Sequence, residues 1–150
     1  HYDRWDSGYS KQQSTRPQSL GYGLVDSASG QCAWIAEKMW AWTDNDGHPE
    51  SALSKDQMLD NISIYWFTAS GASSARLYWE SFADFGSGGV QIPTGCSIYP
   101  KEIIRCSRRW AEQRYEDIQY WNELDKGGHF AAWEQPELFV GEMRSAFAVL

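Results

Sequence analysis

Cysteine is scarce in this sequence. Its 150 residues contain three cysteines, Cys32, Cys96 and Cys106, and no C-x-x-C pair. An odd number of widely spaced cysteines argues against a disulfide framework and favours a reducing compartment, so we expect a cytoplasmic protein.

Long apolar runs are also missing, and none approaches the roughly 20 residues that a membrane-spanning helix needs. The chain starts with His1 and carries no secretory signal pattern, and we expect it to be part of a longer protein.

Basic residues are outnumbered by acidic ones. The sequence has 13 Lys and Arg against 20 Asp and Glu, which gives a formal net charge of −7. The densest basic stretch, residues 105–114, is interrupted by Trp110 and Glu112 and is typical of a solvated helix face. Because nothing basic clusters to offset a phosphate backbone, we expect no nucleic-acid partner.

Metal-binding patterns are absent as well. The run Asp44-Asn45-Asp46-Gly47 resembles part of a calcium loop, but its first ligand position would be Trp42 and the closing Glu is missing. His1 and His48 have no partners at ligand spacing. We therefore expect residues 44–47 to form an exposed turn, and no metal site.

Aromatic residues are abundant: they make up 15% of the chain, with nine Trp. Such a composition indicates a folded domain with a real core and apolar clefts. Residues 1–88 predict helices throughout. Pro17 suits a first helical turn with Thr15 as its cap, Ser27 caps the next helix, and Ser54 with Gln57 forms a capping-box signature. A further helix follows Gly71, and residues 84–89 have the composition of a linker.

The pattern changes over residues 89–150, where strands and helices alternate. Residues 95–99 and 118–124 predict strands, residues 107–115 a helix, and residues 136–150 a last helix. Strand, helix, strand, helix is a repeated βα unit, which implies a parallel sheet. Two parallel strands do not make a stable sheet alone, so we infer an α/β fold whose other strands belong to residues outside this sequence.

Two side chains follow the two predicted strands. In α/β sheets, ligands and reactive groups gather just past the carboxyl ends of the strands. Glu102 follows the first strand, and His129 follows the second within Lys126-Gly127-Gly128-His129. Two glycines allow a turn closed to other residues, which can aim the imidazole over a site. A carboxylate beside an imidazole orients it as a base. The alternative is a surface Glu in a first helical turn and an ordinary surface His.

A nucleophile for acyl or alkyl transfer is not found. A nucleophile elbow needs a strand, a G-x-(S or D)-x-G turn and a helix in succession, and the Gly-Ser-Gly-Gly run at 86–89 has no strand before it. No segment of the HGGG or HGWP kind supplies an oxyanion hole either. We expect the 150 residues alone to be inactive.

Short segments spread over nearly the whole chain share one further pattern. They are Gly8-Tyr9, Thr15-Arg16-Pro17, Gly21-Tyr22-Gly23-Leu24, Asp26-Ser27, Ala33 to Lys38, Asp60-Asn61-Ile62, Tyr65-Trp66, Ser73 to Tyr78, Pro93-Thr94-Gly95, Pro100-Lys101-Glu102 and Gly127 to Glu137. In this order they resemble the microsomal-type branch of the α/β-hydrolase epoxide hydrolases. The resemblance implies a C-terminal portion of that fold, with most of a helical cap at residues 1–88 and the last strands and helices of the core at residues 89–150.

The resemblance also implies a chemistry. In this family a carboxylate attacks an epoxide carbon to form an alkyl-enzyme ester, while two cap tyrosines donate hydrogen bonds to the epoxide oxygen. A His held by an acidic partner, the rest of the catalytic triad, then activates water, and the product is a vicinal diol. His129 matches the base, Glu102 its acidic partner, and Tyr78 and Tyr9 the two tyrosines. No cofactor or metal is implied.

Partners follow from the same resemblance. They are a small apolar or aromatic epoxide, water, and the N-terminal half of the enzyme with the nucleophilic Asp. Detoxification is the implied role, and a homodimer is left open.

Ala28 and Gln31 depart from the family pattern and bear on local packing. Two alternatives stay open: another capped hydrolase, for esters or haloalkanes, and a non-catalytic fragment or subunit of a split hydrolase. Paired tyrosines argue against a haloalkane hydrolase, because in such an enzyme we expect Trp or Asn side chains to donate hydrogen bonds to the halide leaving group.

Overall fold

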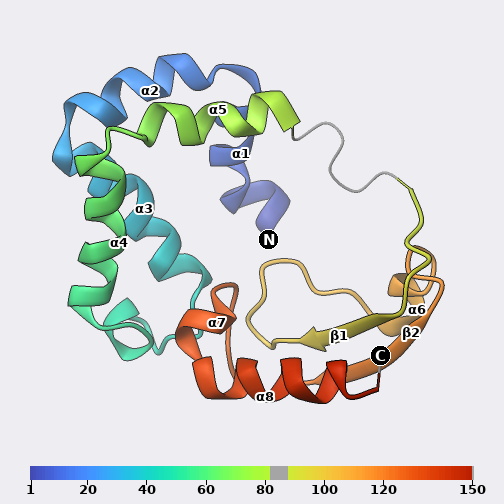
Figure 1. The fold of residues 1–150 in the computed structure, drawn as a ribbon. Helices are drawn as coiled ribbons and strands as arrows, with labels where there is room; N and C mark the ends of the chain where they lie inside the picture. Colours follow the sequence, from blue (N-terminus) through green and yellow to red (C-terminus); the bar gives the residue numbers. More distant parts are fainter. Residues whose placement is uncertain (82–87, 150) are drawn as a thin grey trace. The chain divides into compact units, whose positions relative to one another are not determined.

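The computed structural model describes residues 1–81 and 88–149 (Figure 1). Most of the linker predicted for residues 84–89, and Leu150 in the predicted last helix, lie outside the described residues. The chain divides into two compact units, one formed by His1–Met39 and Ser54–Gly86 and the other by Trp40–Leu53 and Ser87–Leu150. Residues 40–53 thus group with the second unit, although the predicted boundary at residue 88 placed them in the first.

The first unit is helical. A short π-helix, η1, is followed by five α-helices, the third of which ends in the second unit. The helices are η1 (Tyr2–Asp6), α1 (Gly8–Thr15), α2 (Pro17–Asp26), α3 (Ala28–Trp42), α4 (Lys55–Phe67) and α5 (Gly71–Ser81).

Capping residues set where these helices begin. The Ser27 hydroxyl accepts a hydrogen bond from the Gly30 N–H at 3.0 Å, and Ser54 with Gln57 forms a reciprocal capping box, as predicted. Pro17 is the first residue of α2, where its missing N–H costs nothing. The prediction that Thr15 caps this helix is wrong. Thr15 is the last residue of α1, and its hydroxyl donates to the Lys11 carbonyl within α1.

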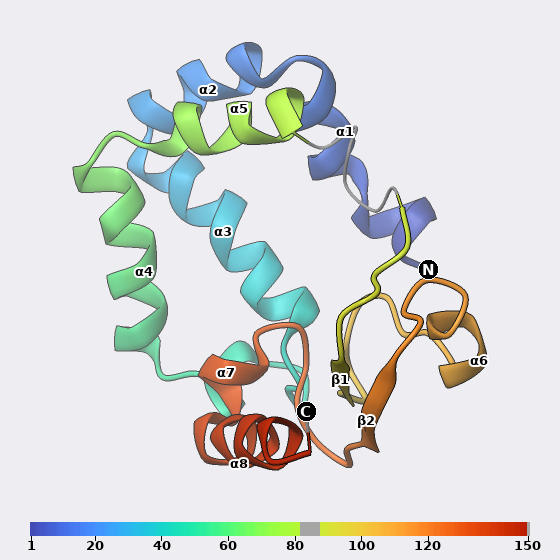
Figure 2. The same ribbon diagram turned by 45° about the vertical axis from the view of Figure 1, so that its right-hand side comes forward.

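Close packing joins α2 to α5, which lie side by side (Figures 1 and 2). A Cβ atom on Gly21 of α2 would come within 2.8 Å of the Cβ of Ala72 on α5, so the two helices approach through small residues. Leu24 and Ala75, one from each helix, are buried in this contact region. The resulting core positions α1 and α5, which carry the two tyrosines discussed below.

The second unit contains a parallel two-stranded sheet. Strand β1 (Thr94–Ile98) pairs in parallel with β2 (Ile118–Glu123), so the predicted βα repeat is confirmed. The other elements are η2 (Pro49–Ser51), a 3-10 helix, and three α-helices, α6 (Arg108–Ala111), α7 (Ala131–Glu134) and α8 (Pro136–Phe147). Helix α8 packs against β1, where a Cβ on Gly95 would lie 2.9 Å from the Cβ of Ala146.

Helix α6 is shorter than predicted. The sequence predicted a helix over residues 107–115, but α6 ends at Ala111. The reason is tertiary: Val90 N–H donates to the Arg114 carbonyl at 2.7 Å, and Glu116 N–H donates to the Val90 carbonyl at 2.9 Å. The Arg114 carbonyl and the Glu116 N–H are therefore bonded to Val90, and neither is available to continue the helix.

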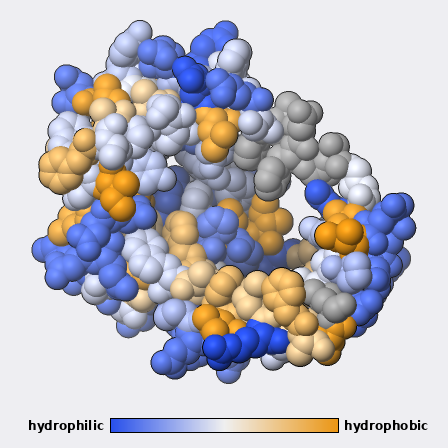
Figure 3. Space-filling model, in the orientation of Figure 1, coloured by the Kyte–Doolittle hydropathy of each residue, from blue (hydrophilic) through white to orange (hydrophobic). Residues whose placement is uncertain are grey.

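A buried carboxylate ties α8 to the sheet. Glu142 is 8% exposed and accepts hydrogen bonds from the Ser97 hydroxyl (2.7 Å) and the Tyr120 hydroxyl (3.0 Å). Its other oxygen accepts from the Asn122 amide at 2.8 Å. Helix α8 exposes three large apolar side chains, Val140, Met143 and Phe147. Hydrophobic and hydrophilic residues both occur along this helix in Figure 3. Within the described residues, no helix is long and apolar enough to cross a membrane.

Candidate active site

The loops that follow β1 and β2 run together beyond the sheet. Lys101 and Gly128 form a parallel bridge, in which the Lys101 N–H donates to the Gly127 carbonyl at 3.1 Å. This bridge pairs the two loops again past the carboxyl ends of the strands, at an offset two residues larger than that of the Ile98–Glu123 pair. It places the residue after Lys101 beside the residue after Gly128, which are Glu102 and His129.

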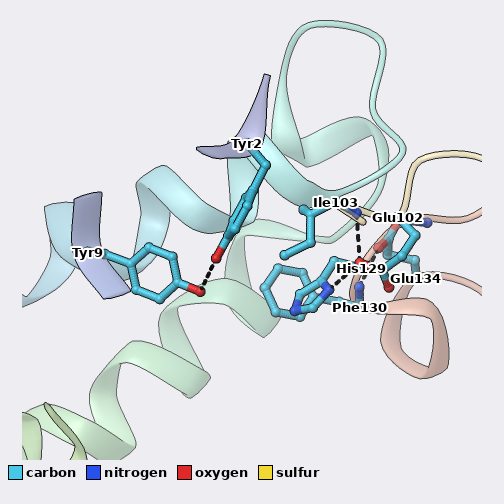
Figure 4. A network of polar contacts seen from close by, with 8 residues as sticks. Tyr2, Tyr9, Glu102, Ile103, His129, Phe130 and Glu134 are labelled. Carbon is cyan, nitrogen blue, oxygen red and sulfur yellow. Dashed lines mark hydrogen bonds and ion pairs between the residues drawn. The ribbon is translucent and has the colours of Figure 1, made fainter. Parts of the chain in front are cut away.

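The two side chains meet, as the strand order predicted. Nδ1 of His129 lies 2.7 Å from Oε1 of Glu102 (Figure 4). Because a carboxylate only accepts, the proton of this bond sits on Nδ1, which leaves Nε2 of the neutral ring as a proton acceptor. The two side chains are 36% and 30% exposed, so the pair is reachable from solvent without being fully hydrated. A His in this tautomer, held by a carboxylate, can take a proton from water.

Several groups bear on the pKa of Glu102. Burial raises this pKa, but the hydrogen bond and the charge of His129, together with the backbone N–H groups of Ile103 and Ile104, outweigh burial and leave the pKa of Glu102 below its ordinary value. The Ile103 N–H lies 2.7 Å from Oε1. Glu102 is therefore ionised over the neutral range and can hold the imidazole.

This lowered pKa predicts how stability depends on pH. A folded-state pKa below the unfolded one contributes stability that is present above the ordinary carboxyl pKa of 4.5 and is lost as the pH falls through the folded value. We expect Glu102→Gln to be less stable than the parent at pH 7 in urea unfolding, with the difference shrinking below about pH 4. Glu137→Gln, at an exposed glutamate, is the control. A difference that stayed constant down to pH 3 would contradict the prediction.

Both glycines before His129 are required by the local geometry. Gly127 has φ +106°, in the left-handed region, and a Cβ there would lie 2.6 Å from the Tyr99 ring. A Cβ on Gly128 would come within 2.5 Å of the Trp42 carbonyl oxygen. The turn therefore brings its backbone against the end of α3, and the His129 N–H donates to that same carbonyl at 2.9 Å.

Aromatic rings enclose the imidazole. The His129 ring centroid lies 5.3 Å from that of Trp42 and 5.2 Å from that of Phe130, both edge to face. Trp42 is 6% exposed. Ring contacts of this geometry restrict the imidazole without occupying its nitrogen atoms.

The two tyrosines named by the resemblance also lie together, within the first unit. The rings of Tyr9 on α1 and Tyr78 on α5 are 5.8 Å apart and nearly perpendicular. The Tyr9 hydroxyl is 3.0 Å from that of Tyr2 (Figure 4), and the Lys38 ammonium lies 5.0 Å from the Tyr9 ring centroid. Burial, the hydrogen bond with Tyr2 and the neighbouring phenol of Tyr78 all raise the pKa of Tyr9. Its hydroxyl thus keeps its proton at neutral pH and can donate it.

The described part of the chain contains no metal cluster, and the predicted exposed turn at residues 44–47 is found only in part, with Asp46 and Gly47 exposed and Asp44 and Asn45 half-buried. Residues 1–81 and 88–149 contain no group of three or more His, Cys, Asp or Glu side chains that could hold a metal ion. Asp44 is half-buried, and its Oδ2 accepts a hydrogen bond from the Gly127 N–H at 2.8 Å. The prediction of an exposed turn is therefore wrong for Asp44, since nothing in residues 42–47 signals a partner 83 positions away.

Comparison with known proteins gives relatives for almost the whole chain. A Stigmatella aurantiaca protein, whose name gives it as a candidate epoxide hydrolase, is 58% identical over 145 residues, which cover 96% of this chain and 33% of that protein. Epoxide hydrolase 1 of Sus scrofa is 34% identical over 97% of this chain and 35% of its own length. No protein-family model matches the sequence.

Solved structures agree with these relatives. The crystal structure of juvenile hormone epoxide hydrolase from the silkworm Bombyx mori matches with a TM-score of 0.88 and 34% identity, over 95% of this chain and 39% of that chain. The Aspergillus niger epoxide hydrolase structure matches with a TM-score of 0.85 and 26% identity, over 99% of this chain and 37% of that one.

The chain is homologous over nearly its whole length to epoxide hydrolases, and its structural neighbours are epoxide hydrolases of the α/β-hydrolase fold. This confirms the family that the short segments predicted, and also the fold class of a C-terminal α/β-hydrolase portion. The chain spans about a third of the length of the curated relatives it matches. The catalytic roles of His129, Glu102, Tyr78 and Tyr9 stay predictions.

Sequence reasoning missed the groups that hold the backbone around His129. Trp42 and Asp44 lie at the end of α3, far from His129 in sequence, and no local pattern singles them out. Glu134 is different, because it stands five positions after His129 inside the quoted run of residues 127–137. An acidic residue shortly before Pro136 is typical of the start of a helix and gives no reason to expect burial. In the structure, however, Glu134 is only 8% exposed.

Proposed function

We propose that the protein carrying this chain hydrolyses an epoxide to a vicinal diol through a covalent alkyl-enzyme ester. The observation that carries the proposal is the 2.7 Å contact between Nδ1 of His129 and Glu102 at the carboxyl ends of two parallel strands. In an epoxide hydrolase of this family, such a pair supplies the base for the second step. The nucleophilic carboxylate would come from residues outside this sequence.

The proposed reaction has two steps, and different residues act in each. In the first, a carboxylate attacks an epoxide carbon, the carbon–oxygen bond of the ring breaks, and the phenols of Tyr9 and Tyr78 donate hydrogen bonds to the resulting alkoxide. The alkoxide takes a proton from one phenol, which regains a proton from solvent. In the second, Nε2 of His129 takes a proton from water as the water oxygen bonds to the ester carbonyl carbon. The ester bond to the diol oxygen then breaks, this oxygen takes the proton from the imidazolium, and the enzyme carboxyl group loses its proton to solvent and is a carboxylate again. Tyrosine donors aimed at charge that develops only in the transition state raise the rate more than they raise substrate affinity.

The substrate we propose is a small apolar or aromatic epoxide, a choice supported by the Trp-rich composition. Relatives are named for juvenile hormone in Bombyx mori and Ctenocephalides felis, which speaks only for those proteins. An ester or haloalkane hydrolase is the competing enzyme. The other rival is a non-catalytic part of a split hydrolase.

Oxygen labelling tests the reaction. We expect the full-length protein, in excess over styrene oxide and in ¹⁸O-water, to give a first-turnover diol without the label, because its new oxygen comes from the enzyme carboxylate. Repeated turnovers should then introduce ¹⁸O. The 150 residues alone should form no diol above background.

Two outcomes would contradict this proposal. Label in the first-turnover diol would indicate direct attack by water and no ester. Turnover of a carboxylic ester or a haloalkane by the full-length protein, with no diol from any epoxide, would favour the competing hydrolase.

A further inference from the structure

Four consecutive backbone N–H groups around His129 are all held by acceptors from two short stretches of chain. Gly127 donates to Oδ2 of Asp44 at 2.8 Å, and Gly128 donates to Oε2 of Glu134 at 3.1 Å. His129 donates to the Trp42 carbonyl, and Phe130 donates to Oε1 of Glu134 at 3.0 Å. Three of these four bonds end on carboxylate side chains, so they are charge-assisted and stronger than ordinary backbone bonds.

Glu134 also fastens the other side of the turn. Its Oε2 accepts a third hydrogen bond from the Asp44 N–H, at 2.7 Å. The carboxylate thus joins Asp44, two residues after the end of α3, to both flanks of His129. Figure 4 labels Glu134, His129 and Phe130 of this network. With 8% exposure, Glu134 has little water to compete for these bonds. Both of its oxygens face only donors, an arrangement that a carboxylate satisfies and an amide does not.

We propose that Glu134 and Asp44 are positioning residues for the water-activating step, in which their carboxylates hold the backbone of residues 127–130 so that His129 stays against Glu102. This proposal rests on the proposed function of His129 as a base. The hydrogen bonds of both carboxylates run to the backbone on either side of His129, so both act through that backbone. The bond between His129 and Glu102 joins two separate loops, so a shift of one loop lengthens it.

Replacing Glu134 with Gln changes the acceptors with little change in shape. The Gln NH₂ group must face at least one backbone N–H that now meets an oxygen, and two donors repel each other. The turn therefore moves away from either Phe130 or the Gly128–Asp44 side. Since a misplacement of about 1 Å costs a reaction about 100-fold, we expect ester hydrolysis to slow by about ten- to 100-fold. Alkylation, which does not use His129, should keep the parent rate.

The matched control is Glu142→Gln. Glu142 is equally buried, in the same unit, and also accepts three hydrogen bonds, but all from side chains of β1 and β2. In the full-length protein, stopped-flow and intact-mass measurements should show slow hydrolysis in Glu134→Gln alone, with both variants similarly destabilised. Parent-rate hydrolysis in Glu134→Gln, or equal slowing in Glu142→Gln, would overturn the proposal.

Asp44 provides a second pair of variants in case Glu134→Gln does not fold. The amide oxygen of Asp44→Asn can still accept from the Gly127 N–H, whereas Asp44→Ala leaves that buried N–H without its partner. We expect Asp44→Ala to slow hydrolysis and Asp44→Asn to restore most of the rate. Equal rates in these two variants would count against a role for the Asp44 side chain.

A measurement without substrate separates this proposal from the proposed function. In NMR spectra of the full-length protein, the His129 Nδ1–H bonded to Glu102 should give a far-downfield proton signal. We expect Glu134→Gln to broaden or abolish this signal and to speed hydrogen exchange at residues 128–130, and Glu142→Gln to preserve both. If no epoxide is turned over but these shifts occur, the proposed function and its water-activating step fail, and only the positioning of His129 against Glu102 stands. If turnover is confirmed and both variants keep the signal, the positioning role fails alone.

Discussion

The His129→Gln variant of the full-length protein is expected to accumulate as a covalent ester of its substrate. Alkylation needs the carboxylate nucleophile and the tyrosine donors, none of which His129 supplies. Hydrolysis of the ester needs a base for water, and removing a general base costs about 100- to 10,000-fold. The ester should therefore form at the parent rate and persist, visible as a mass increase equal to one epoxide molecule on the intact protein.

The controls for this variant come from the same chain. His48→Gln replaces an exposed loop histidine that caps η2, and it should turn over like the parent. Glu102→Gln should hydrolyse the ester slowly for a different reason, since an amide lacks the negative charge that stabilises the imidazolium formed when His129 takes a proton. If folded His129→Gln neither forms an adduct nor turns over substrate, His129 is not simply the base that activates water.

How much of this site the sequence predicts depends on how local each interaction is. Glu102 and His129 each follow a predicted strand, and the rule that parallel strands share one reactive edge is enough to bring them together. The capping box at Ser54 is equally local and is confirmed. In each case the residue types and their spacing in the sequence are enough to predict which groups lie close together.

The supporting groups are not predictable in this way. Asp44 reaches Gly127 across 83 positions, and its own neighbourhood looks like a solvated turn. Helix α6 ends early because the Arg114 carbonyl and the Glu116 N–H are hydrogen-bonded to Val90, an interaction that helix propensities do not predict. Both depend on how distant segments pair, and that pairing is a property of the whole fold rather than of a sequence window. The Gly127–Gly128 pair is a local sign of this support, because a side chain on Gly127 would meet the Tyr99 ring and one on Gly128 would meet the Trp42 carbonyl.

The double variant Tyr9→Phe/Tyr78→Phe is expected to form almost no ester. The two rings lie 5.8 Å apart within one unit, and burial together with the Tyr2 contact keeps the Tyr9 hydroxyl protonated. A hydrogen bond to a charged group contributes about 1.5–3 kcal/mol. Losing one donor should therefore slow alkylation by about one to two orders of magnitude, and losing both by about two to four.

Control variants in the first unit distinguish hydrogen-bond donation by the Tyr9 and Tyr78 hydroxyls from packing of their rings. Tyr22→Phe removes an exposed hydroxyl from α2 and should alkylate at the parent rate. Tyr2→Phe removes the partner of Tyr9 and leaves the Tyr9 phenol in place, so it reports how much of the Tyr9→Phe effect comes from losing that contact. Each change deletes only a hydroxyl, so the unfolding temperatures should stay close to that of the parent. Pre-steady-state alkylation at the parent rate in the folded double variant would exclude both tyrosines as donors and leave their edge-to-face contact as packing between α1 and α5.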